Sequence, residues 1–189
     1  MNAIGQCGQS AARHAFALVC VTVFAISWTC VAPAQSQAAN PTNPTDAQRK
    51  NWYNDPFFAL SNAIRACPQP LGPLMTKAEA DDDAHYRVER GTTCWLAHKC
   101  SKPNSYLYDA DIAAAIRQQL QGDAVFAGTS IWITVQRRFV YAEGCVGPGF
   151  DSAALERRLA AIPAVEQVFV RLTSHPQGAL PYKTLSTAP

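Results

Sequence analysis

The chain has 189 residues, a length that suits one domain with an extension or two small domains. It carries 16 Lys and Arg residues against 14 Asp and Glu residues, so it lacks the basic surplus that electrostatic binding to nucleic acid requires. Hydrophobic residues make up 48% of the chain and charged residues 16%, which is too apolar for a disordered protein. These values favour a small folded protein that has no nucleic-acid partner.

The amino terminus is typical of an export signal. Residues 15–32 contain no charged side chain, and the run closes on Ala32-Pro33-Ala34, a pattern suited to signal peptidase. The sequence therefore predicts a signal peptide over residues 1–34 and a mature protein that is periplasmic or secreted. The alternative is an inner-membrane anchor made by an uncleaved helix, because the apolar run is nearly long enough to span a bilayer.

Cysteine usage agrees with export. Removal of residues 1–34 leaves an even number of cysteines, which in an oxidising compartment predicts two disulfides and neither a metal nor a cofactor. The four are Cys67, Cys94, Cys100 and Cys145. The alternative is a zinc site made by Cys94, His98 and Cys100 with His85 or Cys67, although the Cys-x3-His-x-Cys spacing matches no familiar zinc motif.

The first half of the mature chain is predicted to be a leader followed by helices. Residues 35–50 are rich in Gln, Asn, Pro and Thr and predict a flexible leader. Residues 51–107 predict a helical, disulfide-linked segment in two pieces. The first piece follows Asp55-Pro56, with Phe57, Leu60, Ala63 and Ile64 at helical spacing. The second spans about 76–90, where Thr76 and Glu79 form a capping box.

Residues 108–174 predict a regular α-β-β-α-β domain. A helix capped by Asp109 or Asp111 precedes two strands, at 131–135 and 139–146, that are joined by a turn at 136–138. A helix capped by Asp151 then leads to a last strand around 168–172, and residues 175–189 predict a flexible tail. The expected fold is α+β: an N-terminal helical segment and a three-stranded mixed sheet with two helices on one face.

Several phrases of this domain resemble the BON domain of bacterial envelope proteins. The most specific phrase is Ile162-Pro163-Ala164-Val165-Glu166-Gln167-Val168, and Gly144 matches the glycine in the family's second strand. Ala164 stands where the family usually has Gly, and the turn at 136–138 lacks the family's usual turn glycine. The resemblance covers about 65 residues of the chain. It implies an envelope protein that binds phospholipid or a macromolecule and has no catalytic residues.

The strand alternation places an aromatic stripe on the sheet face that the two helices do not cover. Such a face needs a cover, which could be lipid headgroups, another protein or the chain's own N-terminal segment. Cys145 lies on this face, so a disulfide to the preceding region would fasten that region over the stripe. The expected pairs are Cys100 with Cys145 and Cys67 with Cys94. The candidate contact residues, including two arginines at the turn, are Trp132, Arg137, Arg138, Phe139, Tyr141 and Phe169.

The sequence contains no motif with a catalytic mechanism behind it. His85, His98 and His175 fit no Gly-x-Ser-x-Gly or His-Glu-x-x-His arrangement, so we expect a protein that is not an enzyme. The expected function is association of a BON-like domain with phospholipid or the membrane surface. The alternative is an accessory subunit that binds protein in an envelope-spanning secretion or transport assembly.

Overall fold

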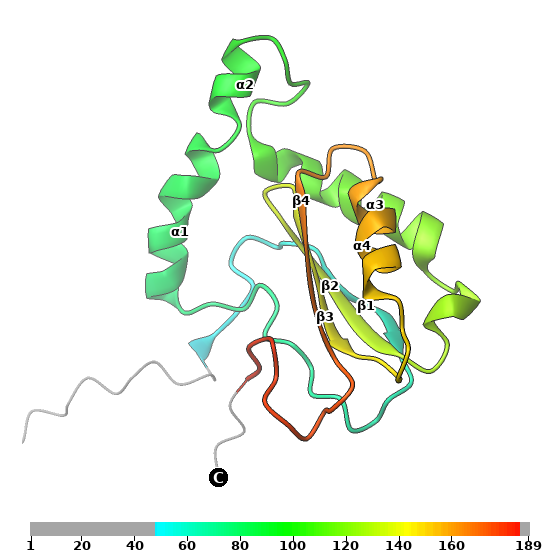
Figure 1. Ribbon diagram of the computed structural model, residues 1–189. Coiled ribbons are helices and arrows are strands. Elements are labelled where there is room, and N and C mark those ends of the chain that lie inside the picture. The colour runs from blue at the N-terminus through cyan, green and yellow to red at the C-terminus, as the bar shows by residue number, and fades with distance from the viewer. Residues whose placement is uncertain (1–47, 186–189) are drawn as a thin grey trace, which may run out of the picture. The chain divides into compact units, whose positions relative to one another are not determined.

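A computed structural model describes residues 48–185. The expected signal peptide, nearly all of the expected leader and the last four residues lie outside the described part. Between residues 48 and 185 the chain forms an α+β fold around a four-stranded mixed sheet, with strand order β1-β2-β3-β4 (Figure 1). No helix in this part is long and apolar enough to cross a membrane.

The sheet has one strand more than the sequence predicts. β1 (Phe57–Asn62) pairs antiparallel with β2 (Ser130–Gln136), which pairs antiparallel with β3 (Phe139–Cys145). β3 pairs parallel with β4 (Gln167–Thr173) through the crossover helix α4 (Ser152–Ala160). The mixed sheet and this crossover order are confirmed.

The helix expected from Phe57 onward is wrong, because this segment is β1. Phe57, Leu60 and Ile64 fit a helical period, but Phe58 and Leu60 also fit a strand period and both pack into the core. The hydrogen bonds along the edge of β2 decide that this segment is a strand, and in this pairing Phe58 lies opposite Ile133. A local pattern of eight residues is too short to overrule such pairing.

The other helices begin close to where the sequence predicts them. α1 (Lys77–Glu89) has the complete capping box of Thr76 and Glu79, and Asp151 caps α4 by accepting a hydrogen bond from Ala154 N at 2.8 Å. The short α2 (Thr92–Leu96) follows α1 after Gly91, which has φ +94°. A 3-10 turn (Ser105–Tyr108) leads into α3 (Asp109–Leu120), and another (Ala124–Phe126) precedes β2.

One hydrophobic core lies between the sheet and α3 and α4. Strand residues of one alternation meet the inner faces of the two helices, as predicted. These core residues include Ile112, Ile116, Leu120, Ile131, Ile133, Val135, Val140, Ala142, Leu155, Leu159, Ile162 and Val168. The other sheet face is therefore the one that α3 and α4 leave free.

Candidate functional site

The aromatic stripe expected on the free sheet face is present and is partly covered. The ring of Tyr141 stacks on that of Phe169 with centroids 4.9 Å apart, and Phe139 meets Phe169 edge-on at 5.9 Å. These three side chains are half-buried, whereas Trp132 is only 7% exposed although it lies outside the main core. The chain itself supplies the cover.

The disulfide between Cys67 and Cys145 fastens part of this cover. It joins the loop after β1 to the end of β3, with the two Cα atoms 5.7 Å apart. The expectation that Cys145 fastens the preceding region to this face is therefore confirmed. The expected partner, Cys100, is wrong. Because β1 is a strand beside β2, it delivers the loop to this end of the sheet, where Ile64 N donates to Ser130 Oγ at 2.8 Å.

The second disulfide joins Cys94 to Cys100, so the expected pair of Cys67 with Cys94 is also wrong. α2 and the turn at His98, which has φ +55°, bring the two Cα atoms within 5.4 Å. The two sulfur ligands of the alternative zinc site are thus bonded to each other. Within residues 48–185, no cluster of three or more His, Cys, Asp or Glu side chains could hold a metal ion. Two disulfides indicate an oxidising compartment outside the cytosol.

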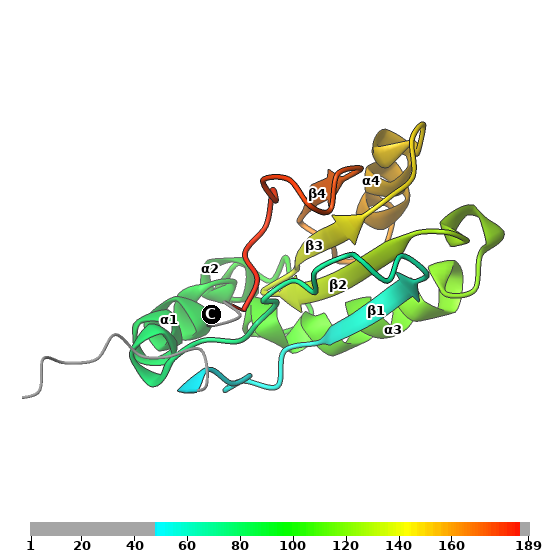
Figure 2. The same ribbon diagram turned by 90° about the horizontal axis from the view of Figure 1, so that it is seen from below.

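The C-terminal segment supplies the rest of the cover. Tyr182 is buried, and its hydroxyl donates to Pro68 O at 2.9 Å beside the Cys67–Cys145 disulfide. Leu71 N donates to Lys183 O at 2.7 Å, and Pro70 bridges Thr184. This segment, red in Figure 2, meets the chain that runs from β1 to α1. A flexible tail was expected from residue 175 onward, but residues 180–184 are held in place by contacts with residues that are distant in the sequence.

A cavity of about 640 Å³ remains between this cover and the sheet, and we call it the sheet-face cavity. Its floor comes from three strands and its roof from two covering segments. The floor residues are Thr134, Gln136, Tyr141, Glu143 and Arg171, and the roof residues are Leu71, Gly72, Leu180, Pro181, Tyr182 and Lys183. A cavity of this size is in the range of small-molecule sites.

Glu143 is the buried acid of this cavity. It lies opposite Arg171 in the β3–β4 ladder, and Arg171 Nη1 donates to Glu143 Oε1 at 3.1 Å. Burial raises the pKa of the Glu143 carboxyl, and the bond from Arg171 opposes that effect only in part. The guanidinium also lies 5.3 Å from the Tyr141 ring centroid.

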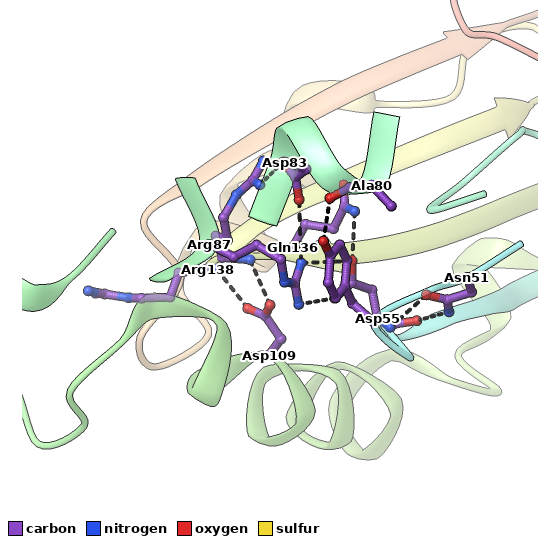
Figure 3. A network of polar contacts seen from close by, with 10 residues as sticks. Asn51, Asp55, Ala80, Asp83, Arg87, Asp109, Gln136 and Arg138 are labelled. Carbon is purple, nitrogen blue, oxygen red and sulfur yellow. Dashed lines mark hydrogen bonds and ion pairs between the residues drawn. The ribbon is translucent and has the colours of Figure 1, made fainter. Parts of the chain in front are cut away.

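A second polar cluster ties α1 to the start of β1 and to the β2–β3 turn (Figure 3). The guanidinium of Arg87 donates to both oxygens of Asp55, at 2.6 and 3.1 Å, and both residues are buried. Gln136 Nε2 donates to Asp55 Oδ2 at 2.7 Å. The Asn51 side-chain amide donates to Asp55 O and accepts from Asp55 N, so it fixes the backbone at Asp55. This cluster holds α1 against the sheet and has the character of a structural network.

Of the two turn arginines, expected as membrane or partner contacts, Arg137 is engaged in this cluster, whereas the side chain of Arg138 points away from it (Figure 3). Arg137 forms an ion pair with Asp83 of α1 and its side chain is only 18% exposed, while Arg138 Nε donates to Ala164 O at 2.7 Å. Both have positive φ, 53° and 69°, as a two-residue turn between strands requires. The charge of Arg137 is therefore poorly placed to meet a lipid phosphate.

Asp109 holds this turn. Its carboxylate accepts the backbone N–H groups of Arg137 and Arg138 at 2.6 and 2.7 Å, so it does not cap α3, and neither does Asp111 (Figure 3). The expectation that Asp109 is a cap was wrong because these two N–H groups lie in a turn 28 and 29 residues away and need an acceptor. Burial raises the pKa of Asp109 to about 6 against the lowering effect of both bonds.

Exposed apolar side chains gather in a different region. Of the seven large apolar side chains that are exposed between residues 48 and 185, five lie between residues 86 and 107. They are Tyr86, Val88, Trp95, Leu96 and Leu107. Trp95 and Leu96 lie inside the short loop closed by Cys94 and Cys100, which we call the 94–100 loop.

Sequence reasoning missed several residues of the sheet-face cavity and of the 94–100 loop. The alternation of β4 puts Arg171 on the same face as Phe169, so that signal was present. An apolar Trp-Leu pair within a tight cysteine loop was a second signal. No local signal exists for Tyr182 and Lys183, because their place depends on contacts with residues 68 and 71.

No family model matches the chain, and neither a curated protein nor a solved structure matches it.

Proposed function

We propose that this is an exported, non-catalytic protein of the cell envelope that associates with a phospholipid surface through the 94–100 loop. The observation that carries the proposal is the exposure of Leu96 (75%) and Trp95 (43%) at the end of a loop held by a disulfide. Insertion of Trp and Leu side chains into the boundary between headgroups and acyl chains is favourable.

The charges around the loop complement an anionic surface. Residues 90–108 contain Arg90, Lys99 and Lys102 and no Asp or Glu. Arg90 and Lys102 pair with acidic residues outside this stretch, whereas Lys99 forms no ion pair within residues 48–185. A lysine beside an apolar tip can reach a lipid phosphate, at about 1 kcal/mol per residue.

The disulfide lowers the entropic cost of binding through the apolar tip of the loop. Cys94 and Cys100 hold α2 and the turn after it in one shape before any contact forms. A surface that is already ordered loses less conformational entropy on binding.

The resemblance to the BON family supports an envelope role. The strand and helix order of residues 109–173 is the expected one, and two of the glycine positions of that resemblance have positive φ. Gly144 has φ +145°, and Ala164, in place of the family's usual Gly, has φ +67°.

Co-sedimentation with vesicles tests the proposal. The native protein should bind vesicles of phosphatidylcholine with phosphatidylglycerol more tightly than vesicles of phosphatidylcholine alone, and salt should weaken the difference. The double variant Trp95→Ser, Leu96→Ser should lose at least about tenfold in affinity for both. Val125→Ser, at a side chain that is 54% exposed outside this region, is the matched control and should bind like the native protein.

A charge variant separates the electrostatic contribution. Lys99→Glu should weaken binding to the anionic vesicles alone, whereas Arg157→Glu on α4 makes the same charge change away from the loop. Equal effects of the two variants, or no binding of the native protein to either vesicle, would show that the proposal is wrong. The exposed loop would then be the candidate contact for a protein of an envelope assembly.

A further inference from the structure

We propose that the sheet-face cavity binds a small organic carboxylate, with its anionic group held by Arg171 and Lys183. The cavity is separate from the 94–100 loop, so this inference does not depend on membrane association. It combines a roof that is fixed by a disulfide and hydrogen bonds, two hydroxyl groups that make no hydrogen bond within residues 48–185, and more positive than negative charge.

The roof of the cavity is fixed at several points. The Cys67–Cys145 disulfide, the hydrogen bond from Tyr182 to Pro68 O and the hydrogen bond from Leu71 N to Lys183 O hold the two covering segments together and to the sheet. Gly72, one of the roof residues, lies so close to the Phe57 ring that an added Cβ would be 2.8 Å from it. A cavity with fixed walls is organised before a ligand arrives.

The floor presents hydroxyl groups that the protein does not use. Thr134 lines the cavity, and its hydroxyl is open to solvent and makes no hydrogen bond to any residue between 48 and 185. Tyr141, its neighbour across the β2–β3 ladder, is half-buried and its hydroxyl also lacks a partner in that range. Hydroxyl groups that line a cavity and have no protein partner can hydrogen-bond a ligand in place of water, so these two are suited to a ligand oxygen.

The charges favour an anion over a cation. The cavity has two cationic side chains, Arg171 and Lys183, and one acid, Glu143. Glu143 engages only Nη1 of Arg171, and Lys183 forms no ion pair in the described chain. A carboxylate can therefore accept from the remaining guanidinium nitrogens and from the ammonium group, an arrangement in which Arg is particularly effective.

The apolar part of the ligand has a surface to meet. The ring of Tyr141, stacked on Phe169, forms part of the floor, and Leu180 and Pro181 lie in the roof. A flat or short aliphatic group attached to the carboxylate would lie between them. The volume suits a molecule about the size of a substituted benzoate or a dipeptide.

Titration of the full mature protein with benzoate, followed by amide NMR, tests the inference. Benzoate should shift the amides of Thr134, Tyr141, Arg171 and Lys183 and saturate below about 10 mM. Benzyl alcohol and benzylamine, which have the same ring without the anion, should shift them at least tenfold more weakly. Lys183→Gln, at an exposed side chain, keeps the backbone bond to Leu71 and should raise the benzoate Kd about tenfold.

Arg157→Gln, on α4 at a side chain that is 71% exposed, is the control and should leave the benzoate Kd unchanged. Arg171→Gln should weaken binding further, and its amide spectrum reports whether the fold is kept. The inference is overturned if benzoate gives no saturating shift, if benzylamine binds as well as benzoate, or if Lys183→Gln and Arg157→Gln behave alike.

Discussion

Asp109 accepts the backbone N–H of Arg138 at 2.7 Å, so that the first residue of α3 fixes the turn between β2 and β3. Arg137 and Arg138 both adopt positive φ, which costs free energy for residues other than glycine. The carboxylate offsets this cost by satisfying both turn N–H groups. The same contact places a carboxyl group in a buried position, which makes it sensitive to pH.

The stability of the protein should fall as pH rises from about 4 to about 6. Burial raises the pKa of Asp109 from 3.8 to about 6 in the folded protein, so the folded state holds the proton more tightly than the unfolded state in this window. The expected loss in the free energy of unfolding is roughly 3 kcal/mol. Chemical denaturation at pH 4 and pH 7 measures it.

The variant Asp109→Asn should show a weaker dependence on pH, because the titrating group is gone. Asp111→Asn is the control, since the Asp111 side chain is 72% exposed and pairs with Lys102 at the surface. A pH dependence that is the same in Asp109→Asn and the native protein would contradict the assignment.

The two disulfides should differ in what they contribute to stability. Cys67 and Cys145 are 78 residues apart and Cys94 and Cys100 are six apart. On the loop-closure model, Cys67→Ser with Cys145→Ser should lower the free energy of unfolding by about 4.5 kcal/mol, and Cys94→Ser with Cys100→Ser by about 2.4 kcal/mol. Denaturant titration of the two double variants measures both values. A smaller loss for the longer loop would contradict the expected order.

The elements that the sequence predicts well are those decided by neighbouring residues. Thr76 and Glu79 start α1 through a contact three residues long, and Asp151 starts α4 in the same way. Apolar alternation placed β2 and β3 because one face of each packs against the core beneath α3 and α4. The fourth strand was missed because the choice between helix and strand at Phe58 depends on β2, more than 70 residues later.

The candidate sites depend even more on distant contacts. Alternation correctly put Tyr141 and Phe169 on the free face, but the cavity above them exists only because Tyr182 returns to Pro68. The sequence gives no sign that Arg137 is paired with Asp83, since consecutive acidic residues on a helix look like a solvated surface. Partner choice by long side chains is decided by tertiary structure.

Removal of Arg87 should destabilise the protein strongly. Arg87→Ala leaves the buried carboxylate of Asp55 without its opposite charge, and the expected loss in the free energy of unfolding is about 3 to 5 kcal/mol. Lys77→Ala breaks the ion pair of Lys77 with Asp81, in which both side chains are more than 60% exposed. It should change the free energy of unfolding by less than about 0.5 kcal/mol. Comparable losses in the two variants, measured by chemical denaturation, would show that the buried cluster is not a structural network.

Gly144 should tolerate no side chain. It has φ +145°, and an added Cβ would lie 2.0 Å from the backbone oxygen of Ser130, so β2 and β3 would have to move apart. We expect Gly144→Ala to lower the free energy of unfolding by at least about 3 kcal/mol. Gly147→Ala is the matched control two residues past β3, because an added Cβ there meets nothing within 4 Å. Thermal and denaturant unfolding of both variants measure the difference, and a Gly144→Ala protein as stable as Gly147→Ala would contradict the close approach of the two strands.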